Sequence, residues 1–171
     1  PWLCRNFNIR PILLVRSPFA VIASQLRHPG FREIGTTHNL FALNQLKYQD
    51  IFLRYEAPIK AIRTQTEMLA NWWAIQHVEL LRYPEEERKW EVVYYEDAVM
   101  NPDLHIQMMC DSNGITHKTD ERKYRMPSAT SQQTVTGTDD YLNNWKSKLD
   151  SREIASISEI LYAYGLHTYV V

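Results

Sequence analysis

The chain has 171 residues, of which 44% are apolar and 23% are charged, and its formal net charge at pH 7 is −1. This length allows one domain with a real core, and the composition is that of ordinary globular proteins, which excludes a disordered chain. The near-neutral charge gives no general attraction to nucleic acid or to an anionic membrane, although it does not exclude a local basic site for a small anion.

The first predicted element is a strand. ILLV at 12–15 is short and apolar, as a strand buried on both faces would be. Ser17 and Pro18 then form a helix-start signature, because a hydroxyl can cap the first turn and proline fits the first helical position. We expect the helix FAVIASQLRH to follow and to end near Pro29-Gly30.

A helical region is predicted next. After a loop at 31–38, apolar residues recur at helical spacing from Asn39 to Arg82. Pro58 predicts a break between two helices, with the proline inside the first turn of the second.

A second clear strand follows at 90–97, where WEVVYYED is rich in valine and tyrosine. Asn101 and Pro102 then start a helix, and Asn113-Gly114 closes it. The polar stretch that follows, at 115–138, predicts an exposed loop.

The C-terminal part predicts two further helices. Asp139 or Asp140 can cap a short helix that runs into Trp145, and Asp150 or Ser151 caps a final helix, SREIASISEILYAYG. The alternation of strands and helices predicts an α/β fold with a parallel sheet. The visible strands are too few for a self-sufficient sheet, so we expect the missing strands to lie upstream.

Cysteine usage is sparse. Cys4 and Cys110 have neither zinc-ligand spacing nor the number needed for a disulfide framework, which favours a reducing, cytoplasmic location. No apolar run approaches the roughly 20 residues of a membrane-spanning helix, and no signal peptide is visible. Because the chain starts at Pro1, shortly before a core strand, we expect the natural protein to extend upstream.

One position suggests a ligand. Ligands bind at the carboxyl ends of parallel strands, and Arg16 lies at such an end. The backbone N–H groups of Ser17, Phe19 and Ala20 would open the next helix and attract an anion, and the Ser24 hydroxyl lies about two turns further on. An arginine fork with a serine hydroxyl suits phosphate or sulfate. The alternative is structural: Arg16 pairs with a carboxylate and Ser24 is a small helix-packing residue.

Three segments resemble, in the family's order, the sulfotransferases that use 3′-phosphoadenosine 5′-phosphosulfate (PAPS). VRSPFAVIASQLR is similar to the family's 3′-phosphate-binding segment, in which a strand ends in arginine and a serine lies eight residues later. WEVVYYEDAVMNPDLHIQMMCDSNGI resembles its strand with a tyrosine-glutamate-aspartate ending and a proline-started helix. NNWKSKLDSREIASISEILYAYGLHTY resembles its closing helix. The resemblance covers residues 10–28 and 90–169.

The resemblance implies a fold and a cofactor site. The fold would be a P-loop-NTPase-like three-layer sandwich with a parallel sheet, only partly contained in this chain, so that 1–171 is a single, N-terminally truncated sulfotransferase-like domain. Arg16 and Ser24 would bind the 3′-phosphate of PAPS or of its product, adenosine 3′,5′-bisphosphate (PAP). Arg125 and Ser128, in the loop KYRMPSATSQQ, would cover the nucleotide. No metal is implied.

The chain departs from the family's pattern in ways that concern mechanism. The family's N-terminal phosphate loop, a strand followed by Gly-Thr-Thr or Gly-Ser-Thr, is not found before Arg16; the GTT at 35–37 comes after that residue and has no strand before it. The general base usually lies in the same missing region, so the catalytic residues are unknown. Ser17 stands where the family often has aspartate or asparagine. Three isolated histidines, His28, His38 and His77, are weak candidates for a base.

Other conspicuous residues have structural interpretations. Glu96 and Asp97, which end the second strand, could pair with Arg16 or cap a helix. Trp72 and Trp73 are interpreted as core residues. Trp145 is expected to pack the C-terminal helix onto the sheet.

The resemblance predicts transfer of a sulfuryl group from PAPS to a hydroxyl or amine of a small-molecule or carbohydrate acceptor, with no nucleic-acid partner. The alternatives are a non-catalytic sulfotransferase-like binding module and another P-loop-type phosphotransferase. The sequence leaves the acceptor and the oligomeric state open.

Overall fold

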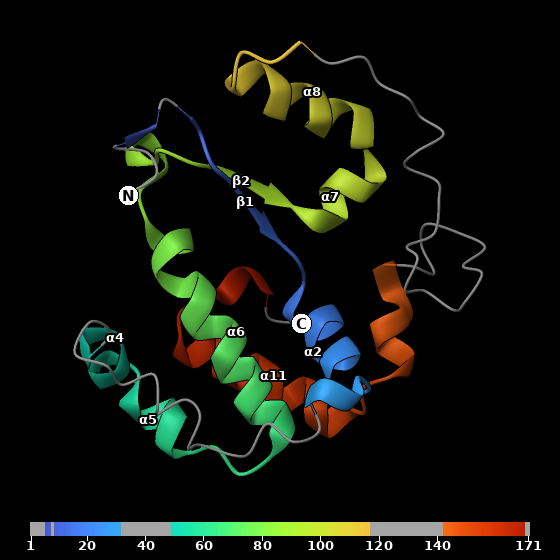
Figure 1. Ribbon diagram of the computed structural model, residues 1–171. Helices are drawn as coiled ribbons and strands as arrows, with labels where there is room; N and C mark the ends of the chain where they lie inside the picture. The colour runs from blue at the N-terminus through green and yellow to red at the C-terminus, as the bar shows by residue number, and fades with distance from the viewer. Residues whose placement is uncertain (1–5, 8, 32–48, 117–141, 170–171) are drawn as a thin grey trace. The chain divides into compact units, whose positions relative to one another are not determined.

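The computed structural model describes residues 6–7, 9–31, 49–116 and 142–169. The chain divides into two compact units, which are described separately (Figure 1). The first unit comprises Pro1–Ser17 and Pro84–Asn143, and the second comprises Pro18–Tyr83 and Asn144–Val171.

The first unit is built on a two-stranded parallel sheet. Strand β1 (Ile12–Val15) pairs with β2 (Glu91–Tyr94), in the register that places Ile12 opposite Glu91 and Val15 opposite Tyr94. The short η3 (Glu85–Glu87) precedes β2, and helices α7 (Tyr95–Met100) and α8 (Pro102–Ser112) follow it. The carboxyl ends of the two strands therefore lie side by side.

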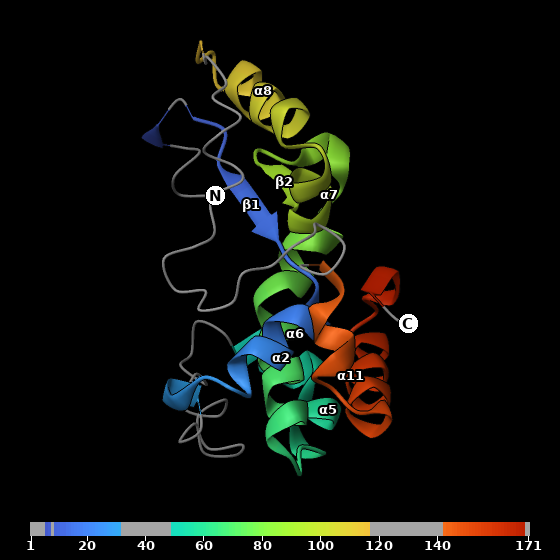
Figure 2. The ribbon, with the colours of Figure 1, turned by 90° about the vertical axis from the view of Figure 1, so that its right-hand side faces the viewer.

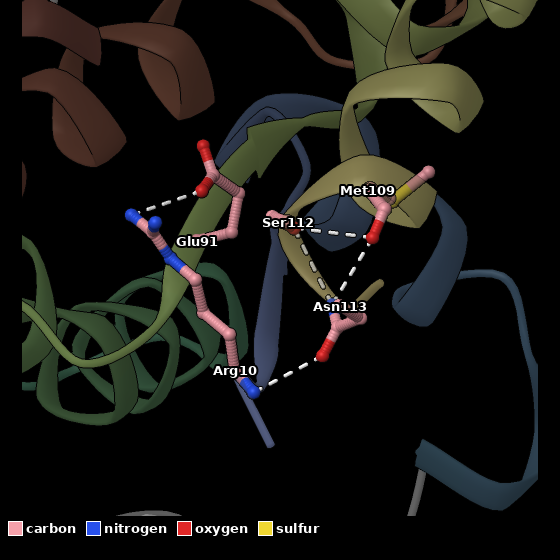
Figure 3. A network of polar contacts seen from close by, with 5 residues as sticks. All are labelled: Arg10, Glu91, Met109, Ser112 and Asn113. Carbon is pink, nitrogen blue, oxygen red and sulfur yellow. Dashed lines mark hydrogen bonds and ion pairs between the residues drawn. The ribbon is translucent and has the colours of Figure 1, made fainter. Parts of the chain in front are cut away.

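Polar contacts tie the amino ends of the two strands to the end of α8 (Figure 3). The Arg10 guanidinium pairs with the Glu91 carboxylate at 3.1 Å, and the Arg10 backbone N–H donates to Oδ1 of Asn113 at 3.0 Å. The amide of Asn113 and the hydroxyl of Ser112 both donate to the carbonyl of Met109. The segment just before β1, the start of β2 and the end of α8 are thus joined.

The second unit is helical. Helices α6 and α11 pack together, and both contact α2 (Figure 2). Its elements are α2 (Pro18–Gln25), η1 (Pro29–Phe31), α4 (Gln49–Arg54), α5 (Glu56–Lys60), α6 (Gln65–Arg82), η4 (Asn144–Ser147), α11 (Ser151–Ala163) and η5 (His167–Tyr169).

The core of the second unit combines aliphatic side chains with a satisfied polar network. Its fully buried members include Ile22, Ile59, Met68, Leu69, Val78, Ile157 and Leu161. The buried Tyr164 stacks on Tyr55, with 4.3 Å between ring centroids, and its hydroxyl donates to Asn71 at 2.9 Å. Burial raises the pKa of Tyr164 well above the value of a free phenol, so this hydroxyl stays a donor at physiological pH.

The predicted α/β class with a parallel sheet is confirmed at that level. The part of the chain that the structure describes is mostly helical, with one small two-stranded parallel sheet. No described helix is both long enough and apolar enough to cross a membrane.

Several element boundaries differ from the predictions. The second strand ends at Tyr94 instead of Asp97, because the chain turns directly into α7. Pro58 lies in the first turn of α5, as expected, but that helix ends at Lys60. A new helix, α6, starts after Thr64, whose side chain forms a reciprocal capping box with Glu67.

The expected role of Trp145 is corrected in part. Its ring stacks on Phe19 of α2, with 4.9 Å between centroids, so within the second unit it packs against a helix. The expectation for the tryptophan pair holds for Trp73, which is 3% exposed, whereas Trp72 is half-buried.

Candidate functional site: the carboxyl ends of the two strands

Arg16 lies at the carboxyl end of β1, as predicted, and its side chain is half-buried. Its guanidinium lies over the ring of Tyr95, with Cζ 4.7 Å from the ring centroid. Val15 and Tyr94 are opposite one another in the sheet, so the residues that follow them meet at the same edge. Tyr95 was not predicted as a site residue, because the sequence pattern places it inside the strand at 90–97, whereas β2 ends at Tyr94.

The Arg16 side chain has no polar partner among the described residues. Its Nε is buried and makes no hydrogen bond, and no carboxylate in the described part of the chain pairs with the guanidinium. Buried donors are normally hydrogen-bonded, and an unpaired charge that is partly withdrawn from water is costly. The predicted structural alternative, a carboxylate partner for Arg16, is therefore not seen there. The arrangement suits an external anion.

The nearby carboxylate of Glu96 has a different partner. Its Oε1 accepts the backbone N–H of Ser17 at 2.9 Å in a partly buried contact. The predicted pairing of Glu96 with Arg16 is not observed, and no side-chain capping bond is found at the start of α7. The Glu96 side chain instead accepts the N–H of the residue that precedes α2. The Ser17 amide is consequently not free for an anion, contrary to the sequence-based expectation. Asp97 is exposed in the first turn of α7.

Ser24 lies near the end of α2 with an exposed side chain. This exposure argues against the predicted structural alternative of a packing residue. Arg16 and Ser24 belong to different units, so their joint binding of one phosphate stays a prediction. Arg125, Ser128, His38 and the GTT at 35–37 lie outside the described residues, so the roles expected of them also stay predictions.

The two described histidines that were weak candidates for a base have structural contacts. The His77 ring stacks on Trp73, with 4.2 Å between centroids, and its Nδ1 lies 2.7 Å from the Trp73 carbonyl. Burial lowers the pKa of His77, and the backbone hydrogen bond opposes this in part. Nδ1 of His28 accepts the N–H of Gly30 at 3.1 Å and so supports a turn.

Neither a metal-ligand cluster nor a cavity coincides with the predicted site residues that the structure describes. The described residues contain no group of three or more His, Cys, Asp or Glu side chains that could hold a metal ion. A cavity of roughly 220 Å³ lies in the second unit, and none of the predicted site residues lines it. Its lining residues are Pro58, Ala61, Ile62, Glu67, Asn71, Ser156, Glu159, Ile160 and Ala163.

Comparison of the chain with models of known protein families, with curated proteins and with solved structures gives no match. The features of this chain that bear on function are the three sequence segments and the surroundings of Arg16. Of the residues predicted to bind the cofactor, the structure describes two, Arg16 and Ser24. Arg16 is the stronger candidate of the two, because its Nε is buried and makes no hydrogen bond.

Proposed function

We propose that this chain is the 3′-phosphate-binding part of a PAPS-dependent sulfotransferase. The fold in this proposal is the P-loop-like sandwich, of which β1 and β2 are two parallel strands. The acceptor is a hydroxyl or an amine on a small molecule or a carbohydrate. Arg16 binds the 3′-phosphate of PAPS and PAP, with Ser24, Arg125 and Ser128 as further contacts.

One observation carries the proposal: Arg16 is a half-buried cation with a buried, unbonded Nε at the carboxyl end of a parallel strand. A guanidinium offers a planar fork of donors that matches two oxygens of a phosphate. An incoming phosphate would satisfy both the unbonded donor and the unpaired charge. The position agrees with the general placement of ligands at this edge of parallel sheets.

The chemistry requires little of Arg16 beyond binding. PAPS supplies the sulfuryl group: its S–O bond to the 5′-phosphate breaks as a new S–O or S–N bond to the acceptor forms. The acceptor loses its proton to a base, and PAP leaves. Arg16 binds the 3′ side of the nucleotide and orients it. The ring of Tyr95 stacks against the guanidinium and holds it in place through a cation–π contact.

The proposal predicts that PAP stabilises the chain through Arg16. At about a hundred times its dissociation constant, PAP should raise the melting temperature by about 5–10 °C. Arg16→Ala should remove nearly all of this shift, because it deletes the charge-assisted, bidentate hydrogen bonds to the 3′-phosphate. Differential scanning fluorimetry of the 171-residue chain measures both values.

Arg10→Ala is the matched control. It removes the same charge from the other end of the same strand, where Arg10 already pairs with Glu91, so it should leave the PAP shift intact. Adenosine 5′-monophosphate, which lacks the 3′-phosphate, should give no shift that depends on Arg16. A PAP shift that survives Arg16→Ala would rule out the site.

A transfer assay separates the enzyme from its alternatives. Radiolabelled PAPS with a panel of hydroxyl and amine acceptors should yield labelled product and PAP. Arg16-dependent PAP binding without transfer to any acceptor would favour the non-catalytic module. Stabilisation by ATP and not by PAP would favour a phosphotransferase.

A further inference from the structure

The two residues that follow β2 contact the two residues that follow β1. Tyr95 lies under the guanidinium of Arg16, and Glu96 accepts the backbone N–H of Ser17. All four residues belong to the first unit, so these contacts lie within one compact unit. The register of the two strands brings the pairs together, since Val15 and Tyr94 are directly opposite.

The Glu96 carboxylate contacts the residue next to Arg16 in the sequence and does not form an ion pair with Arg16 itself. Glu96 bonds to the amide of the residue next to Arg16, and among the described residues the guanidinium makes no ion pair. The hydrogen bond to Ser17 fixes the carboxylate, and within the described part of the chain the guanidinium keeps its charge unpaired for an external anion.

We propose that Glu96 is a positioning residue for the anion site at Arg16. By holding the Ser17 amide, it fixes the turn that carries the guanidinium, which favours binding. Its negative charge near an incoming phosphate opposes binding, because like charges repel at short range. The inference rests on the proposed function only in that the ligand of Arg16 is a phosphate monoester such as PAP.

The two effects can be separated by two substitutions. Glu96→Gln keeps a side-chain oxygen that can accept the Ser17 N–H but removes the charge, so PAP should bind about three- to tenfold more tightly. Glu96→Ala removes the acceptor as well and frees the turn, so PAP should bind at least about tenfold more weakly. A residue that only supports folding would not produce opposite effects in these variants.

Asp97→Asn is the matched control. It makes the same charge change one residue later, at an exposed position, and should alter the dissociation constant by less than about twofold because solvent screens the charge. Isothermal titration of PAP gives the constants, and the tighter binding of Glu96→Gln should diminish in high salt. The ¹⁵N-resolved amide of Ser17 should exchange slowly with solvent in the wild type and the Gln variant, and rapidly in the Ala variant.

The outcomes distinguish this inference from the proposed function. A wild-type chain that does not bind PAP would overturn both. A chain that binds PAP through Arg16, but whose Gln variant binds no more tightly or whose Ala variant binds equally well, would overturn the role of Glu96 alone.

Discussion

At the residue scale, Arg82 and Gly165 show how one side chain can require a glycine elsewhere in the chain. The Arg82 guanidinium donates to the Tyr55 hydroxyl at 2.6 Å and to the carbonyl of Tyr164 at 2.7 Å, at the end of α11. Gly165 has a φ of +69°, a conformation that other residues adopt only with strain. A Cβ atom at this position would also collide with Nη2 of Arg82.

Gly165→Ala should therefore destabilise the second unit by about 2–4 kcal/mol, of which about 1–2 kcal/mol is backbone strain. Urea unfolding followed by tryptophan fluorescence measures the loss. In an Arg82→Ala background the same substitution should cost only the strain, because the clash is gone. Equal costs in the two backgrounds would show that Arg82 does not constrain this position.

At the scale of elements, the N-termini of the two long helices are fixed by the same device. Thr64 with Glu67 caps α6, and Asp150 with Glu153 caps α11; each forms a reciprocal capping box. Asp150 accepts two backbone N–H groups, from Arg152 and Glu153, both at 2.8 Å. Such contacts satisfy donors that have no partner within the helix.

Asp150→Ala should lower the free energy of unfolding by about 1 kcal/mol, because the first-turn amides lose their acceptor. Asp150→Asn should retain most of that stability and lose only a few tenths of a kcal/mol of charge–dipole attraction. Chemical denaturation of both variants tests this, with the exposed neighbour Ser151→Ala as a control that should change stability by less than about 0.5 kcal/mol. An Asn variant as unstable as the Ala variant would contradict the capping role.

At the scale of the whole molecule, the buried apolar residues are distributed unevenly. Among the described residues, Val15 and Val93 are the buried hydrophobic members of the first unit, and all the others belong to the second. Large apolar side chains of the first unit are exposed instead, among them Ile12, Leu14, Met100, Leu104 and Met108. Stability follows buried apolar area, so the two units should differ in local stability.

Hydrogen exchange should reveal this difference. Backbone amides of α6 and α11 should exchange most slowly, and those of β1, β2 and α8 should exchange sooner, because fewer buried contacts oppose their opening. Exchange of the strand amides as slow as that of α6 would contradict this expectation. Mass spectrometry of peptic fragments gives the required resolution.

The residues near Arg16 show what local pattern can predict about the site. An apolar run ending in a cation indicated the strand end, and the structure confirms Arg16 at that place. Tyr95 and Glu96 were not assigned their contacts, because these depend on the register between two strands far apart in the sequence. The pattern of valines and tyrosines likewise could not show that the chain turns into α7 directly after Tyr94.

The sequence by itself determined the locally encoded features: the strand at 12–15, proline-started α8 and the start of α11, although it left Asp150 and Ser151 as alternative caps and the structure shows Asp150. These depend on the dihedral preferences and hydrogen-bonding groups of neighbouring residues. Only the tertiary structure decided which charges pair. Glu96 bonds to the Ser17 amide and Arg16 stays without an ion pair among the described residues, because hydrogen-bond partners are chosen by proximity in space.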